Sequence, residues 1–175
     1  MGKALIFCGI KHCGKSTLGR SLAGILGIRF SDTDLLLEKE NGKGVRELFR
    51  EWGEDEFRRR ETLLLKKLSA AEIRVIALGG GALLRPENVP VVKALGTLIW
   101  CDVSDETAFE RIAAEGLPPF LEQAADPMEE FRSRNRSRQE TFSAVCDLRF
   151  VPESDASIEH NVLKLQQQLM EKGII

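Results

Sequence analysis

Short apolar runs alternate with segments of helical periodicity along the whole chain. The apolar runs predict buried strands over residues 4–8, 27–30, 74–78, 97–101 and 147–151. The spacing of apolar positions predicts helices over residues 15–26, 35–39, 45–50, 55–68, 89–95, 105–115, 128–145 and 157–172. Residues 117–127, rich in proline and acidic side chains, show no clear periodicity. Strands separated by helices predict an α/β fold, a doubly wound parallel sheet in a three-layer α/β/α arrangement.

The 175 residues contain no internal repeat or low-complexity tract, and we expect a single domain over residues 1–175. A net charge of −2 argues against a nucleic-acid partner, which would favour a basic surface. No apolar stretch approaches the roughly 20 residues of a membrane span. The first strand starts so near the N-terminus that we expect no signal peptide. We therefore expect a cytoplasmic protein without a membrane partner and, for this architecture, a monomer.

The four cysteines lack the spacing of a metal site or of a disulfide framework, as expected in a reducing compartment. Cys8 and Cys101 lie in apolar runs, and we expect them to be buried. Cys13 precedes a predicted helix and stands near Lys15, which predicts a lowered thiol pKa and a reactive side chain.

Residues 9–17, with the sequence GIKHCGKST, match the phosphate-loop pattern G-x-x-x-x-G-K-[ST] between a predicted strand and a predicted helix. Free backbone N–H groups and the helix dipole converge there on nucleotide phosphates. We expect Lys15 to reach the β and γ phosphates of ATP and Ser16 to ligate Mg²⁺. The alternative is a glycine-rich turn that fits the pattern by chance. His12, which stands at a position that glycine often takes, makes this loop stiffer.

Three further segments should converge beside this loop, because ligands of parallel sheets bind at the carboxyl ends of the strands. Asp32 and Asp34 follow the second predicted strand, and residues 79–81, all glycine, follow the third. Residues 58–60, all arginine, lie on the predicted helix between those two strands. Of two carboxylates beside ATP and Mg²⁺, one can orient water bound to the metal, and the other can accept the proton of an acceptor hydroxyl. The alternatives are a helix cap for the aspartates and a tight turn for the glycines.

With these motifs in this order, the sequence resembles the shikimate kinase family, a group of phosphate-loop kinases similar to nucleoside monophosphate kinases. The resemblance covers nearly the whole chain and rests on the segments GIKHCGKST, SDTD at 31–34, GEDEFR at 53–58 and LGGGA at 78–82, with Arg138 four residues before Phe142. It implies ATP-dependent phosphorylation of the 3-hydroxyl of shikimate to shikimate 3-phosphate, a step of chorismate and aromatic amino-acid biosynthesis.

The resemblance also implies the role of each matched residue. Lys15 and Asp34 are the expected catalytic residues, Lys15 at the transferred phosphate and Asp34 as base toward the attacking hydroxyl. Ser16 and Asp32 are expected to hold Mg²⁺, Asp32 through water. The nucleotide is expected at Gly9, His12, Cys13, Gly14, Lys15, Ser16, Thr17 and Arg111. The acid is expected at Asp34, Arg58, Gly79, Gly80, Gly81 and Arg138. For Arg58, the alternative is a solvated helix face paired with Glu54 or Glu61.

The chain departs from the family pattern in the expected mobile lid, approximately residues 112–127. Pro118 stands where the family places an arginine that reaches the ATP phosphates. Such an arginine can contribute about 10³-fold or more to phosphoryl transfer. Its absence implies a slow enzyme, a substitute such as Arg111 or Arg134, or lost catalysis. Two alternatives therefore stand beside the active kinase: a catalytically weakened module that binds nucleotide or shikimate, and a kinase for a related polyol acid such as gluconate.

Overall fold

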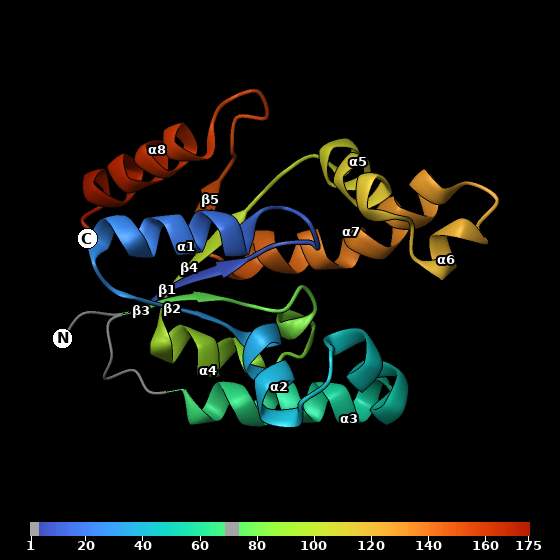
Figure 1. Cartoon of the computed structure of the whole chain (residues 1–175). Coiled ribbons are helices and arrows are strands. Elements are labelled where there is room, and N and C mark those ends of the chain that lie inside the picture. Colours follow the sequence, from blue (N-terminus) through green and yellow to red (C-terminus); the bar gives the residue numbers. More distant parts are fainter. Residues whose placement is uncertain (1–3, 69–73) are drawn as a thin grey trace.

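Among the residues that the structure describes, five parallel strands form one sheet in the order β2-β3-β1-β4-β5. The computed structural model describes residues 4–68 and 74–175, and Figure 1 shows the sheet between layers of helices. The strands are β1 (Ala4–Cys8), β2 (Arg29–Asp32), β3 (Arg74–Ala77), β4 (Gly96–Cys101) and β5 (Leu148–Phe150). The predicted α/β fold with a doubly wound parallel sheet is confirmed.

Strand β1 lies at the centre of the sheet because it is apolar throughout. All five of its residues are buried, and it pairs with β3 on one side and with β4 on the other. A strand covered by helices on both faces needs such a continuous apolar run. The segment that follows β1 therefore leaves from the middle of the sheet, at the edge where ligands of open α/β sheets bind.

Two layers of helices cover the two faces of the sheet (Figure 1). Helix α1 packs on β1, β2, β3 and α8, while α4 and α7 contact β4, and α3 packs against α4. Right-handed crossovers explain why the helices divide between the two faces. From β1 to β2 the chain moves toward the β2 edge of the sheet, whereas the later crossovers move toward the β5 edge, so their helices lie on the opposite face. The helices are α1 (Lys15–Leu26), α3 (Val45–Lys67), α4 (Asn88–Leu95), α7 (Pro127–Val145) and α8 (Ile158–Glu171).

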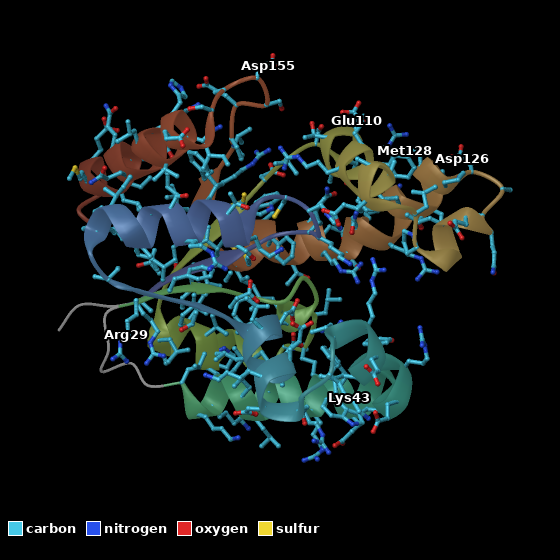
Figure 2. The ribbon with its side chains drawn as sticks, viewed as in Figure 1. Arg29, Lys43, Glu110, Asp126, Met128 and Asp155 are labelled. Atoms are coloured by element: carbon cyan, nitrogen blue, oxygen red, sulfur yellow. The ribbon has the colours of Figure 1, made fainter. Side chains whose placement is uncertain are left out.

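Shorter elements border the carboxyl ends of the strands: α2 (Thr33–Asn41), the 3₁₀ turn η1 (Ala82–Leu84), α5 (Asp105–Glu115) and α6 (Pro119–Glu122). Figure 2 shows Glu110, Asp126 and Met128 on the group formed by α5, α6 and the start of α7, which projects beyond the strands. The expected lid, residues 112–127, falls in this group. The mobility of this expected lid stays a prediction, and so does the expectation that residues 1–175 form a single domain.

The elements at the carboxyl edge differ from the sequence prediction in extent. Helix α2 begins at Thr33, before the predicted start, because the Asp32 side chain caps it by accepting the N–H groups of Asp34 and Leu35. The helices predicted over 45–50 and 55–68 meet in α3, interrupted only at Gly53, where φ is 74°. The segment 117–127, without periodicity in the sequence, contains the single turn of α6.

Two apolar clusters hold these elements. The larger one fills both faces of the sheet and includes Cys8 and Cys101, 2% and 1% exposed, which confirms their predicted burial. The smaller one fixes α2 against α3 through Leu37, Leu48, Phe57 and Leu64. Within residues 4–68 and 74–175, no helix has the length and apolar character that crossing a membrane requires. The smaller cluster matters for the site, because α2 and α3 carry Asp34 and Arg58.

Candidate active site

The loop between β1 and α1 has the form that nucleotide phosphates require. Gly14, with φ 93°, precedes α1, and no side chain caps the helix, so its first N–H groups remain available to an anion. The Lys15 ammonium donates to the Ile10 carbonyl over 2.9 Å and turns back across the loop. Strand, loop and helix follow one another as predicted, which supports the phosphate-loop interpretation over a chance glycine-rich turn.

His12 occupies the left-handed region that glycine adopts more easily, with φ 62°. Two contacts from α5 hold it there: Arg111 donates to the His12 carbonyl over 3.0 Å, and Glu115 lies 3.5 Å from the His12 ring nitrogen Nδ1. Burial lowers the pKa of His12 against the attraction of Glu115, so the imidazole is neutral at pH 7. These contacts place Arg111 directly beside the phosphate loop.

The Cys13 thiol lies beneath the loop and is only 1% exposed. Burial by itself would raise its pKa, but the hydrogen bond with Cys101 and the adjacent Lys15 cation lower the pKa of Cys13 to about 6. The predicted lowered pKa is therefore confirmed. The predicted reactivity is not supported, because reactive cysteines also need access to solvent.

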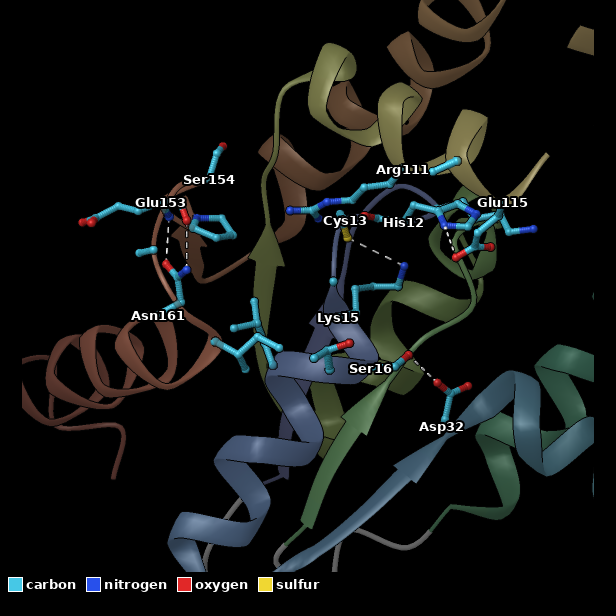
Figure 3. A pocket seen from close by; sticks show the side chains of 18 of the residues that line it. His12, Cys13, Lys15, Ser16, Asp32, Arg111, Glu115, Glu153, Ser154 and Asn161 are labelled. Atoms are coloured by element: carbon cyan, nitrogen blue, oxygen red, sulfur yellow. Dashed lines mark hydrogen bonds and ion pairs between the residues drawn. The ribbon is translucent and has the colours of Figure 1, made fainter. Parts of the chain in front are cut away.

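A cavity of about 660 Å³ opens above the loop, within the range of nucleotide-sized ligand sites. Figure 3 shows Lys15, Ser16 and Asp32 in one part of it, Arg111 and Glu115 of α5 above, and Glu153, Ser154 and Asn161 across from them. The predicted residues that line it are His12, Cys13, Gly14, Lys15, Ser16, Thr17, Asp32, Asp34 and Arg111. Gly9 lies below the lining, where an added Cβ would meet the Cys13 sulfur at 2.6 Å.

Ser16 and Asp32 meet at the base of the cavity. The Ser16 hydroxyl donates to Oδ2 of Asp32 over 2.6 Å, while Oδ1 of Asp32 caps α2. The helix-cap interpretation of Asp32 is therefore confirmed for Oδ1, whereas the role of Asp32 toward Mg²⁺, for which Oδ2 beside Ser16 stays available, remains a prediction. A hydroxyl and a carboxylate oxygen fit Mg²⁺, which binds oxygen ligands through few protein groups and keeps several waters.

Asp34 stands between the cavity and a second group of polar residues. Burial and the neighbouring Asp32 raise the pKa of Asp34, against the attraction of Lys15 and Arg58. A Cβ added to Gly79 would lie 2.6 Å from Oδ1 of Asp34, so the carboxylate rests against that glycine. Thr33 fixes the contact, because its buried hydroxyl accepts the Gly79 N–H over 2.8 Å.

The other two glycines make close approaches of their own. A Cβ at Gly80 would lie 3.6 Å from the Lys11 nitrogen and from the Gly9 carbonyl, and a Cβ at Gly81 would lie 2.6 Å from Cζ of Arg58. Gly79 therefore lies against the Asp34 carboxylate, Gly80 against the phosphate loop, and Gly81 against the Arg58 guanidinium. The Gly80 N–H has no acceptor among the described residues, as expected of a donor kept for a ligand. Residues 79–82 do form a tight turn, closed by the Ala82 N–H, which donates to the Gly79 carbonyl over 3.1 Å. The close approaches at Gly79 and Gly81 explain why glycine stands in that turn.

Arg58 is partly buried and paired. It donates to Oε2 of Glu61 over 2.8 Å, and the two side chains are 14% and 0% exposed. Burial raises the pKa of Glu61 against the attraction of Arg58, and Oε1 of Glu61 has no hydrogen-bond partner. The alternative prediction for Arg58 had two parts. Its pairing with Glu61 is confirmed, but its place on a solvated helix face is wrong. Arg59 and Arg60 do lie on the outer face, both bonded to Glu56.

Arg138 of α7 lies half-buried within the field of Arg58. Burial and the Arg58 cation lower the pKa of Arg138, and its guanidinium donates to the Arg134 carbonyl. Two guanidinium groups that repel one another in a partly buried place favour an anion between them, a carboxylate above all. Arg58, the three glycines and Arg138 do not line the nucleotide cavity. They form a separate cluster with Asp34 at its border, which we call the acceptor cluster after the ligand that the family resemblance implies for it.

Sequence reasoning missed several residues of this site. Lys11 and Glu115 line the cavity, and so does the segment 152–154. Asn161 holds that segment by accepting the Glu153 N–H over 2.8 Å and donating to the Glu153 carbonyl over 3.0 Å. Glu61 was visible only as a possible partner of Arg58, three residues away. No sequence pattern identified these residues, because their part in the site depends on which side of the cavity the folded chain places them.

Comparisons with known proteins agree on one family. The shikimate kinase family model matches residues 11–170. A shikimate kinase of Symbiobacterium thermophilum is 34% identical over 171 residues, 97% of either chain, and one of Neisseria gonorrhoeae is 36% identical over 143 residues, 82% of this chain and 84% of the relative.

Solved structures agree with these matches. A shikimate kinase of Acinetobacter baumannii in complex with shikimate superposes with a TM-score of 0.86 at 26% identity, covering 98% of this chain and 95% of the other. A gluconokinase of Sinorhizobium meliloti, covering 97% of both chains with a TM-score of 0.58 and 13% identity, shares the fold alone. The chain belongs to the shikimate kinase family of phosphate-loop kinases.

Proposed function

We propose that this protein transfers the γ-phosphate of ATP to the 3-hydroxyl of shikimate, giving ADP and shikimate 3-phosphate, a step toward chorismate and the aromatic amino acids. The observation that carries the proposal is the position of Asp34. Its carboxylate lines the nucleotide cavity and also rests against Gly79 in the acceptor cluster. A hydroxyl held there lies between a base and the phosphates at Lys15, as phosphoryl transfer requires.

On the nucleotide side, the loop N–H groups, Lys15 and Thr17 would bind the phosphates, and Arg111 would lie beside them. The cavity continues to residues 152–154, which supports placing the base of ATP there. Ser16 and Asp32 would hold Mg²⁺, Asp32 through water. The ion, when bound, neutralises charge on the phosphate oxygens during transfer.

On the acceptor side, Arg58 and Arg138 would bind the carboxylate of shikimate, and Gly80 would donate its N–H to the same ligand. Guanidinium groups suit this task because each can present two parallel donors to a carboxylate. Asp34 would accept hydrogen bonds from ring hydroxyls. A small carboxylated polyol is therefore the substrate class that this cluster fits.

The reaction then needs one proton transfer and one bond exchange. Asp34 accepts the proton of the 3-hydroxyl as its oxygen attacks the γ-phosphorus. The bond between that phosphorus and the β,γ-bridging oxygen breaks, and ADP leaves with the electron pair. Lys15 stabilises the charge on the transferred group. Closure of residues 112–127 would exclude water, so that the phosphoryl group reaches the hydroxyl instead.

The two alternatives are less well supported. Lys15, Ser16, Asp32 and Asp34 all meet around one cavity, which does not suggest a decayed site. The family matches favour shikimate over gluconate. The expectations of a monomer, of a cytoplasmic location and of no nucleic-acid or membrane partner stay predictions.

A coupled ADP-release assay with Mg-ATP tests the proposal, run first with shikimate and then with gluconate. We expect turnover that depends on shikimate and is at least tenfold slower with gluconate, because a guanidinium pair and ring-hydroxyl contacts are built for one acceptor. Calorimetry with each ligand accompanies the assay. Binding of ATP and shikimate without turnover would support the weakened module instead, and faster turnover with gluconate would contradict the substrate.

A further inference from the structure

The segment expected to close over the nucleotide brings no positive charge with it. Residues 112–127 contain no lysine and no arginine, but they do contain Glu115, Glu122 and Asp126. Phosphoryl transfer spreads negative charge over the transferred group, and a second cation beside Lys15 stabilises it. If this protein is a kinase, that cation has to come from another part of the structure.

Most candidate cations already have partners. Arg111 donates to the His12 carbonyl, and Arg132 donates to Glu106 over 2.6 Å. Arg134 is bonded to Glu130 on its own helix. Arg58 is paired with Glu61. The substitutes that the sequence suggested, Arg111 and Arg134, are thus engaged, although Arg111 stays close enough to bind the nucleotide.

Lys11 differs from these residues. It lies in the phosphate loop, lines the nucleotide cavity and is exposed, and no hydrogen bond or ion pair joins it to another described residue. Its backbone nitrogen is next to Gly80, so Lys11 lies on the side of the loop that faces the acceptor cluster. This is the border across which the phosphoryl group would pass.

The charges around Lys11 fit an ammonium that awaits an anion. Partial desolvation of the ammonium at the cavity wall and the Arg46 guanidinium lower the pKa of Lys11, against the opposing effect of Glu115 and Asp34, and Lys15 adds a weaker repulsion. Arg46 stands in the first turn of α3 and also acts on His12. A phosphate between these cations would relieve their mutual repulsion. It would also favour the charged form of Lys11, since an anion stabilises an ammonium.

We propose that Lys11 contacts the transferred phosphoryl group and supplies the second cation that the lid lacks. The proposal rests on the kinase function proposed above. It assigns the charge to a residue of the phosphate loop itself, so the charge does not have to arrive with the lid. Lys11 would stabilise the transferred group in the transition state more than it stabilises bound ATP.

The variants Lys11→Met and Lys11→Arg test this in the ADP-release assay. We expect Lys11→Met to lower kcat by about 10²-fold, a typical loss for one preorganised donor, with the KM for shikimate changed less than about twofold. Lys11→Arg restores the charge and should recover most of the loss. Lys66→Met, an exposed lysine in the last turn of α3, is the matched control and should behave as wild type.

Calorimetry supplies a readout that a structural role would not move. The ligand is ADP with Mg²⁺, aluminium fluoride and shikimate, in which the fluoride complex imitates the phosphoryl group in transfer. Lys11→Met should weaken this binding about 10²-fold but change the affinity for ADP alone by less than about twofold, because a transition-state contact is absent from the ground state. Thermal unfolding should show all four proteins equally stable.

Three results would overturn the inference. A kcat of Lys11→Met within threefold of wild type would show that Lys11 is not needed. Equal weakening of ADP and of the fluoride complex would make Lys11 a nucleotide-binding residue only. Absence of shikimate-dependent turnover in the wild-type protein would remove the proposed function together with this inference, whereas wild-type turnover with an unaffected Lys11→Met removes the inference alone.

Discussion

The two halves of the proposed site are built in different ways. The nucleotide half comes mainly from one contiguous segment, the loop and first turn of α1, and its donors are largely backbone N–H groups. The acceptor half is assembled from α2, α3, the glycines after β3, and α7. Its donors and acceptors are mostly charged side chains, held by one another and by buried contacts such as Thr33 with Gly79.

This difference decides how each half responds to change. Backbone donors at a helix terminus stay in place as long as the helix forms, and they attract phosphate without a particular side chain. Charged side chains in a buried cluster depend on their partners, and removing one leaves the other unpaired. We therefore expect substitutions in the acceptor half to alter binding of the acid and turnover while ATP binding persists.

The largest effect should follow from Asp34→Asn. The amide cannot accept the proton of the hydroxyl, so kcat should fall by about 10² to 10⁴-fold, the usual contribution of a general base. ATP affinity, measured by calorimetry, should change less than about twofold, since removing one carboxylate leaves the loop N–H donors intact. Asp55→Asn, an exposed aspartate of α3, is the control. Turnover within threefold of wild type would remove Asp34 as the base.

Arg138→Ala should affect the acid and spare the nucleotide. Loss of one charge-assisted contact to a carboxylate predicts an increase in the KM for shikimate of about 10 to 10²-fold, with the KM for ATP nearly constant. Arg136→Ala provides a matched control, because Arg136 is exposed two residues earlier on α7. Equal increases in both KM values would place Arg138 at the nucleotide and break the division into two halves.

A smaller effect is expected from Gly81→Ala. The new Cβ would meet the Arg58 guanidinium, with Cζ at 2.6 Å, and the flexible end of that side chain can move away. The fold should therefore survive, while the KM for shikimate should rise about tenfold, equivalent to 1.4 kcal/mol.

The control is Gly24→Ala in α1, where an added Cβ would meet no atom within 4 Å. It should leave both KM values unchanged and raise stability by about 0.5–1 kcal/mol. A Gly81→Ala protein with lowered thermal stability and an unchanged KM for shikimate would show that Gly81 serves folding and does not position Arg58.

The smallest effect concerns the pH dependence of stability through Glu61. Its pKa is raised above 4.5 in the folded protein, so protonated Glu61 favours folding below pH 4.5, and that contribution is lost as pH rises through the folded pKa. Glu61→Gln cannot lose a proton. Its free energy of unfolding should therefore fall less than that of wild type between pH 4.5 and 7. Urea denaturation across this range measures it, and parallel pH profiles would contradict the prediction.

Local patterns in the sequence predicted the fold class and the phosphate loop. The apolar runs predicted five strands along the chain, and the pattern at residues 9–17 predicted the loop, since both signals lie within a few neighbouring residues, but neither gave the order of the strands in the sheet. The limits of α2 were harder, because a side-chain cap, not apolar spacing, decides where α2 begins. The spacing of apolar residues likewise predicted two separate helices where α3 continues through Gly53.

The acceptor half shows what only the tertiary structure decided. The sequence indicated that Asp34, residues 79–81 and the helix of Arg58 meet at the carboxyl ends of the strands, but their assignment with Arg138 to one acid-binding site came from a resemblance to a family. How the elements pack decides which glycine touches which group, how Arg58 pairs with the buried Glu61, and why Lys11 beside Gly80 has no ion pair with any described residue. Neighbouring residues determine helices, strands and the phosphate loop, whereas contacts between side chains of different elements form only once the chain has folded.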